Sequence, residues 1–166
     1  MNRLPHIILA LTLALTLIGT ACNDDSCFEN GSSLPLAQCY MDDEQVTISG
    51  LTIMGIGAPG DSLLVDSSAI KEVYLPLRAS VNSTSFVLKR WGILDIEKVE
   101  FLDTLIIDYE AIEFFHSAEC GAMYNFNIKR VTCTDNAIDS VTLLTTLITN
   151  AIAPSLRIHF TNLSQR

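Results

Sequence analysis

The chain has 166 residues, and its 19 Asp and Glu side chains outnumber its 10 Lys and Arg side chains to give a net charge of −9. That length suits one domain behind a short leader. So acidic a surface is repelled by phosphate backbones and by anionic lipid headgroups, which argues against nucleic-acid binding and against electrostatic attachment to a membrane.

Residues 1–21 have the composition of a signal peptide. Arg3 supplies a charged start, residues 7–18 form an uncharged apolar run, and Gly19-Thr20-Ala21 provides small residues for cleavage. The apolar run is shorter than the roughly 20 residues that cross a bilayer, which disfavours a permanent membrane span. Cys22 follows at once, as in a bacterial lipobox, although Gly19 stands where leucine is usual. We predict cleavage before Cys22 and lipidation of its thiol; secretion without a lipid is the alternative.

Residues 22–34 are expected to form a tether, and residues 35–166 a single β-domain. The acidic stretch 23–26 resembles the signal that sends Bacteroidota lipoproteins to the outer face of the outer membrane; a solvated linker is the alternative. We therefore expect a protein that is lipid-anchored in the outer membrane, on its periplasmic or its surface-exposed side.

Alternating apolar and polar residues dominate the rest of the chain. β-Branched and aromatic residues are frequent in these stretches, which is typical of half-buried strands, and turn signals separate them at short intervals. In chain order the pattern predicts strands at residues 36–42, 46–54, 63–65, 72–79, 84–89, 104–109, 114–120, 122–133 and 156–160.

Three local signals refine this pattern. Asp42-Asp43-Glu44 is expected to form a hairpin turn after the first strand, because it lacks the spaced ligands of a calcium loop. Gly and Pro are expected to keep residues 56–60 from being helical. Pro76 lacks an amide hydrogen, so the strand 72–79 should lie at an edge or contain a bulge.

Two segments are ambiguous. Residues 93–102 could be a strand or an irregular excursion, and residues 141–152 fit a helix or a strand, of which we favour the strand. Within 122–133 the alternation places Tyr124, Phe126 and Ile128 on one buried face. Many short strands separated by regular turns predict an all-β fold, a single antiparallel β-sandwich of immunoglobulin-like or related Greek-key type.

Four cysteines follow Cys22, and an even number in an exported chain indicates disulfides. We favour Cys27–Cys120 with Cys39–Cys133, because the first bridge would hold the start of the domain against its densest β region. Two local bridges, Cys27–Cys39 and Cys120–Cys133, remain the alternative. The spacings are too long for the short ligand pairs of a zinc site.

The sequence predicts no catalytic constellation and no cofactor or metal. His116 and His159 are far apart and do not fit the H-x-x-x-H spacing of zinc hydrolases. His116 adjoins Ser117, but adjacent strand residues point to opposite faces, so the two side chains should not meet. We therefore expect that the protein is not an enzyme.

A short pattern occurs three times in the chain, as Asp61-Ser62-Leu63, Asp103-Thr104-Leu105 and Asp139-Ser140-Val141. It resembles the O-glycan acceptor motif of exported Bacteroidota proteins. Glycosylation at Ser62, Thr104 and Ser140 would place these residues on surface turns. The alternative is that Asp-Ser and Asp-Thr simply begin strands after turns.

The order of these motifs resembles a family of small, uncharacterised Bacteroidota lipoproteins built on a domain of unknown function. The resemblance rests on the lipobox, the acidic stretch, Leu75-Pro76-Leu77, the run 103–109 and Ala118-Glu119-Cys120-Gly121. It implies a β-rich exported lipoprotein and no activity. The family's N-terminal cysteine and Cys-Gly pair correspond here to Cys27 and Cys120-Gly121, which supports pairing Cys27 with Cys120.

The expected function is that of a cell-envelope lipoprotein, a non-enzymatic module that binds a protein partner of the outer membrane. A small-ligand or glycan-binding β-sandwich is the alternative. An exposed aromatic patch would favour a glycan, and a long bare edge strand would favour a protein that adds a strand to the sheet.

Overall fold

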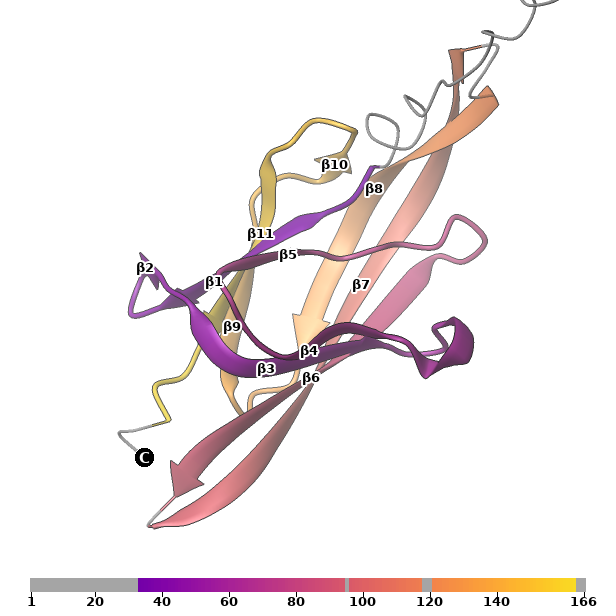
Figure 1. Cartoon of the computed structure of the whole chain (residues 1–166). Helices are drawn as coiled ribbons and strands as arrows, with labels where there is room; N and C mark the ends of the chain where they lie inside the picture. Colours follow the sequence, from indigo (N-terminus) through magenta and orange to yellow (C-terminus); the bar gives the residue numbers. More distant parts are fainter. Residues whose placement is uncertain (1–32, 95, 118–120, 164–166) are drawn as a thin grey trace, which may run out of the picture.

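The computed structural model describes residues 33–94, 96–117 and 121–163, and almost all regular structure in them is β-strand (Figure 1). The strands are β1 (Leu36–Met41), β2 (Glu44–Gln45), β3 (Ile48–Gly55), β4 (Leu63–Ile70), β5 (Glu72–Tyr74), β6 (Ser83–Leu94), β7 (Glu97–Ser117), β8 (Gly121–Cys133), β9 (Ile138–Leu143), β10 (Leu147–Ile148) and β11 (Pro154–Phe160). One short 3₁₀ helix, η1 (Pro59–Asp61), precedes β4.

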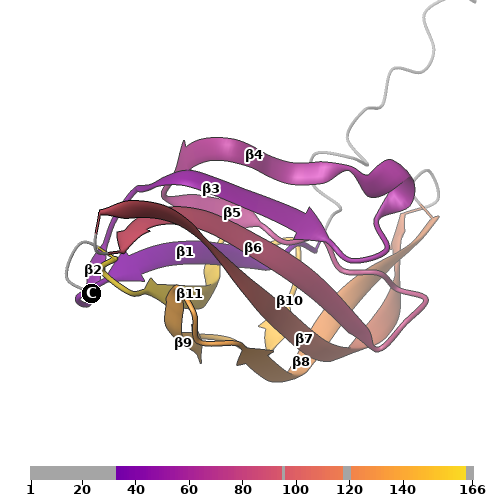
Figure 2. The same ribbon diagram turned by 90° about the horizontal axis from the view of Figure 1, so that it is seen from below.

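The strands form two sheets that face one another (Figures 1 and 2). One has the order β2-β1-β11-β9, with β5 pairing with β1 on the same edge as β2, and the other has the order β10-β8-β7-β6-β3-β4. This confirms the predicted all-β sandwich. One pair departs from antiparallel pairing, since β1 and β11 run parallel. Alternation within a strand carries no information on the direction of a partner so distant in sequence, so this pair could not be predicted.

The core lies between the two sheets and is almost wholly aliphatic and aromatic. Inward-facing residues of β1 and β11 meet those of β3, β6, β7 and β8, and the side chains of Ile53, Leu105, Ile107, Ile138 and Leu156 have no exposed surface. Burial of this apolar surface is the main stabilising term of the fold.

Two long hairpins built from β6, β7 and β8 extend the second sheet past the first. β6 pairs with β7 from Ser83–Asp108 to Leu94–Glu97, so the ambiguous segment 93–102 is strand around a hairpin turn. The segment 141–152 is strand only in part: it contains the end of β9 and all of β10, the residues between and after them are irregular, and none of the twelve is helical. The expected strand 104–109 and the described residues 114–117 of the expected strand 114–120 belong to the single strand β7; residues 118–120 lie outside the described residues.

The register of β8 agrees with the predicted alternation at two of three positions. Phe126 and Ile128 are buried, whereas the side chain of Tyr124 is 39% exposed. Tyr124 pairs with Glu113 on the part of the β7–β8 hairpin that projects beyond the other strands (Figure 1). The expectation that Tyr124 is buried is therefore wrong, because alternation defines a face but not where the opposing sheet ends.

The turn residues explain three further local outcomes. Asp42 and Asp43 have positive φ angles of 49° and 64°, and they form the two-residue hairpin turn predicted between β1 and β2. The expectation that residues 56–60 contain no helix is wrong at the end of that segment, because Pro59 begins η1. The strand predicted at 72–79 ends at Tyr74, before Pro76, which has no amide hydrogen for a ladder.

Candidate functional site

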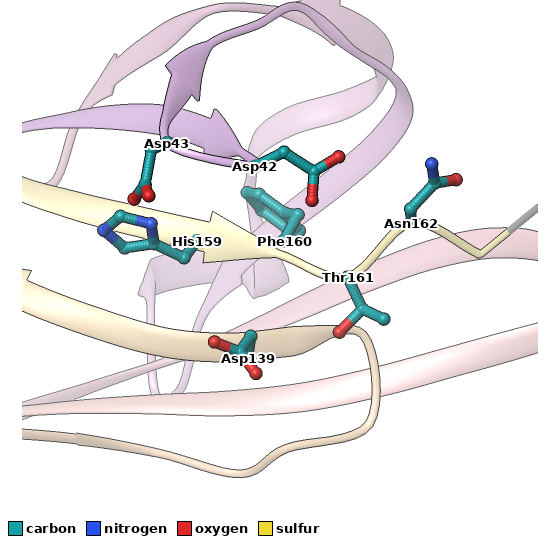
Figure 3. A pocket seen from close by; sticks show the side chains of 7 residues that line it. All are labelled: Asp42, Asp43, Asp139, His159, Phe160, Thr161 and Asn162. Carbon is teal, nitrogen blue, oxygen red and sulfur yellow. The ribbon is translucent and has the colours of Figure 1, made fainter. Parts of the chain in front are cut away.

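A polar hollow of about 450 Å³ opens where the β1–β2 turn meets the end of β11 (Figure 3). We call it the acidic hollow; its lining residues are Asp42, Asp43, Asp139, His159, Phe160, Thr161 and Asn162. The tight turn between β1 and β2 presents Asp42 and Asp43 on one side, and β9 presents Asp139 on the other (Figure 3). Three carboxylates thus surround one opening.

His159 contributes an imidazole ring to the lining of the acidic hollow. It lies on β11 between Tyr40 of β1 and Ser140 of β9, its ring centroid is 5.6 Å from that of Tyr40, and its Nε2 is 3.4 Å from the hydroxyl of Thr142. No ion pair joins His159 to a carboxylate in the part of the chain that the structure describes. Within the same residues, no three His, Cys, Asp or Glu side chains converge as metal ligands. The acidic hollow therefore attracts cations by its charge without offering them a ligand set.

A second hollow, of about 220 Å³, lies beside η1. The η1 segment is at the opposite end of the sandwich from the β1–β2 turn (Figures 1 and 2). We call it the apolar hollow. Its walls come from the end of β3, η1, the start of β4, the segment after β5 and the start of β6; the lining residues are Gly55, Ile56, Ala58, Pro59, Ser62, Leu63, Leu64, Pro76, Leu77, Arg78, Thr84 and Phe86. Hydrocarbon dominates this surface, and Arg78 is the one charged residue among these lining residues.

The wall formed by residues 76–78 has no strand partner and is held by Tyr109 of β7. The Tyr109 hydroxyl donates to the carbonyl oxygen of Arg78 at 2.9 Å and accepts from the Arg78 amide at 3.0 Å. It also lies 2.6 Å from the hydroxyl of Thr84, which acts as donor because the single Tyr109 proton is already used. One buried hydroxyl therefore fixes an otherwise irregular segment against β6 and β7.

Asp103, also on β7, has a comparable function near the acidic hollow. Its side chain is buried, and one carboxylate oxygen accepts from the hydroxyl of Thr134 at 2.7 Å and from the amide of Asn136 at 2.8 Å. The other oxygen accepts from the amides of Ala137 at 2.7 Å and Ile138 at 3.1 Å. Asp103 thus holds the β8–β9 connection through four hydrogen bonds that compensate for burial of its charge.

Asp103 stands out in the sequence only as part of a glycan motif. In the structure Asp103, Leu105, Ile107 and Tyr109 occupy alternate positions of β7, and all four side chains are buried. A carboxylate at an inward position of an apolar alternation is a signal that could have identified this buried polar group from sequence.

The outward side of the β6–β7 hairpin exposes a cluster of large apolar side chains. Trp91, Ile93, Leu102 and Ile106 form this outer hairpin face, and each keeps at least 36% of its surface exposed. The inward side of the same arm is covered, because Leu163 is buried close to Gly92, and the guanidinium of Arg90 donates to the carbonyl of Thr161 at 3.0 Å. Apolar exposure is therefore concentrated on one side of the hairpin.

The edge strand β4 is poorly suited to accepting an added strand. It has a free outer edge in the strand order, but its pairing with β3 shifts register at three points, and Ser67 has a φ of 42°. Bulges and a left-handed residue twist an edge away from the flat geometry that strand addition needs. The prediction of a protein partner that adds a strand gains no support at β4.

The predicted Cys39–Cys133 bridge is wrong, because both cysteines are free thiols. Cys39 lies within β1 of one sheet, and Cys133 is the last residue of β8 in the other. The number of cysteines in a sequence does not show which of them lie close together in the fold. Burial raises the pKa of the Cys39 thiol to about 12, with the charge of Arg90 opposing the rise, and burial followed by the charge of Asp103 raises the pKa of Cys133. The other favoured bridge, Cys27–Cys120, lies outside the described residues, as does Cys22.

The three candidate glycan acceptors occupy different environments. Ser62 is exposed between η1 and β4, as a surface-turn site requires. Thr104 is half-buried within β7 and pairs with Val87, and Ser140 is exposed within β9. Two of the three therefore lie in strands and not on the surface turns that were expected. The side chains of His116 and Ser117 lie outside the described part of the chain.

The described residues form a small all-β domain whose surface includes the acidic hollow, the apolar hollow and the outer hairpin face. The part of the chain that the structure describes contains no helix with the length and hydropathy of a membrane span. Residues 50–160, more than half of the chain, match the Family of unknown function (DUF6452), and the protein belongs to this family. The matched range begins after the lipobox and Cys27. The comparisons with curated proteins and with solved structures gave no match.

Proposed function

We propose that this protein is a lipoprotein of the Bacteroidota outer membrane, anchored through Cys22, that binds a protein partner and is not an enzyme. The anchor is supported by the order of charge, apolar run, small residues and cysteine in residues 1–22. Two or more acyl chains would hold the protein at the membrane stably, since each buried methylene contributes about 0.8 kcal/mol.

The observation that carries the partner proposal is the outer hairpin face. Exposed large apolar side chains gathered on one face are typical of protein contact surfaces. On this face they alternate with charged side chains of both signs, because Trp91 pairs with Glu100, Ile93 with Lys98 and Leu102 with Lys89, and Lys89 and Glu100 form an ion pair at 3.2 Å. A glycan is the weaker candidate, because Lys98 lies 4.7 Å from the centre of the Trp91 ring and covers a face on which a sugar would stack.

The anchor is tested by metabolic labelling with a clickable fatty acid in the native host. The wild-type protein and Cys27→Ala, which keeps the lipobox, should be labelled, and Cys22→Ala should not. Equal labelling of Cys22→Ala would exclude lipidation at Cys22.

The partner is tested by a photo-crosslinking amino acid placed at Ile93 of the anchored full-length protein in living cells. The matched control is the same amino acid at Thr142, which is exposed on β9 of the other sheet. We expect a protein adduct of one discrete mass from position 93 and none from position 142. Leu102→Glu should abolish that adduct and leave the thermal unfolding midpoint unchanged. Identical adducts from both positions, or lipid adducts alone from position 93, would refute this surface as a protein contact.

A further inference from the structure

We propose that the apolar hollow is a binding site for a medium-chain aliphatic carboxylate, with the hydrocarbon chain inside the hollow and the carboxylate on Arg78. This site lies away from the outer hairpin face, and the inference does not depend on the proposed protein partner. It assigns a ligand class to a feature that neither the family nor the sequence motifs explain.

The walls require an apolar ligand. Ile56, Leu63 and Leu64 remain exposed by 38% to 48% around the hollow, which is unusual for aliphatic side chains gathered at one place. Phe86 and Leu77 complete the lining from the core side. A hydrocarbon chain placed here would remove these side chains from water, and it would leave no polar group of the ligand without a hydrogen-bond partner.

The rim requires an anion. The guanidinium of Arg78 lies over Gly57, where a Cβ atom added to the glycine would come within 3.6 Å of Nη1. Gly57 has a φ of 72°, a conformation that glycine adopts without strain, so the loop can approach the guanidinium closely. Arg78 takes part in none of the three ion pairs among the described residues. An arginine outside these ion pairs can donate two parallel hydrogen bonds to one carboxylate, and Arg78 is the charged residue that lines the hollow.

The hollow is preformed. Tyr109 fixes both backbone polar groups of Arg78, and Thr84 supports the same hydroxyl. A wall that is already ordered avoids the entropy of ordering it on binding.

The size of the hollow sets the chain length. Its volume of about 220 Å³ holds about seven units of the roughly 30 Å³ that one water occupies, and a methylene is of similar size. A carboxylate of about eight carbons should therefore fill it. Each methylene added up to that length should raise affinity about fourfold, and longer chains should add little.

The test uses full-length protein in isolated membranes and a photoreactive octanoate with a diazirine in its alkyl chain. The adduct should map to residues 55–64 and 76–86. Unlabelled octanoate should compete at least tenfold better than octanol, and octylamine should compete worst. Butanoate, hexanoate and octanoate should form a rising series that levels off at decanoate. Octanol or octylamine competing as well as octanoate, or adducts outside the two segments, would overturn the proposal.

Three variants separate the charge from the cavity. Arg78→Gln should remove the advantage of octanoate over octanol, and Ala58→Phe should block labelling by filling the hollow. Arg130→Gln is the matched control, since Arg130 is a surface arginine of β8 paired with Asp108. It should label like the wild type, and all three should keep the wild-type unfolding midpoint. Unchanged discrimination in Arg78→Gln would exclude Arg78 as the carboxylate partner.

Discussion

The two ends of the sandwich are both held by buried polar side chains of β7, but in different ways. Asp103 binds the backbone of one short connection, and its four hydrogen bonds go to residues 134–138. Tyr109 binds the backbone of Arg78, in a segment that has no strand partner. At the first end the buried carboxylate of Asp103 is fully hydrogen-bonded, so the acidic hollow there lies only at the surface. The second end keeps an ordered wall around unfilled apolar space, which is the property a ligand site needs.

Asp103→Ala should give the largest effect. Removing the carboxylate takes away the acceptor of four hydrogen bonds, two of which come from the buried amides of Ala137 and Ile138, so the free energy of unfolding should fall by about 3–5 kcal/mol. Denaturant melts would measure it, with the exposed Asp139→Ala as control, expected to remain within about 0.5 kcal/mol of wild type. A loss under about 1 kcal/mol for Asp103→Ala would mean that this end does not depend on its carboxylate.

Cys39 extends the comparison to a buried group that stays neutral. In the folded protein the pKa of Cys39 is raised to about 12 from an ordinary 9.0. The stability that the neutral buried thiol contributes is therefore complete below pH 9.0, and it is lost as the pH rises toward the folded pKa. The stability of the wild type should therefore fall faster than that of Cys39→Ala, by about 1.4 kcal/mol per pH unit between roughly pH 9 and 11. Parallel pH profiles of the two proteins, measured by denaturant melts, would contradict the burial argument.

Tyr109→Phe should cost less than Asp103→Ala, because it removes neutral hydrogen bonds. The amide of Arg78 loses its partner, and its carbonyl keeps only the longer hydrogen bond from the Val81 amide at 3.4 Å, so we expect a loss of about 1–3 kcal/mol in the free energy of unfolding. Tyr124→Phe, at an exposed position of β8, is the matched control and should be neutral. The same variant should weaken octanoate competition, since the wall of the apolar hollow is no longer fixed. Equal stability of Tyr109→Phe and the wild type would show that the Tyr109 hydroxyl does not hold the segment 76–78 in place.

The exposed pair Asp108–Arg130 should give the smallest effect. Hydrogen bonds from Arg130, then from Ser83, lower the pKa of Asp108 below its ordinary 3.8. The stability that this pair contributes is therefore present above that value and is lost as the pH falls through the folded pKa. In Arg130→Gln an NMR titration should show the pKa of Asp108 moving back up, with little change in unfolding, because exposed pairs are weak. An unchanged Asp108 titration would show that Arg130 is not its main partner.

The strands could be predicted because alternation is a local property. The strands expected at residues 36–42 and 156–160 correspond closely to β1 and β11, and Asp42-Asp43 forms the expected turn. Alternation does not encode which strand will pair with which. It gave no sign of the parallel β1–β11 pair or of how far β6 and β7 project.

The sites were harder to predict because they are made of distant segments. The apolar hollow is lined by residues near 56 and near 78, the second segment is held by Tyr109, and no motif records that contact. The Cys39–Cys133 bridge was wrong for the same reason, because the count of cysteines says nothing of which ones meet in space.

The central claim is that each end of the sandwich is held by its own residue of β7, and hydrogen exchange resolved by residue tests it most directly. After correction for global stability, Tyr109→Phe should speed exchange of the Arg78 amide and leave the amides of Ala137 and Ile138 as protected as in the wild type. Asp103→Asn should do the reverse. Loss of protection at both ends from either change would contradict the account, because the two ends would then open as one unit.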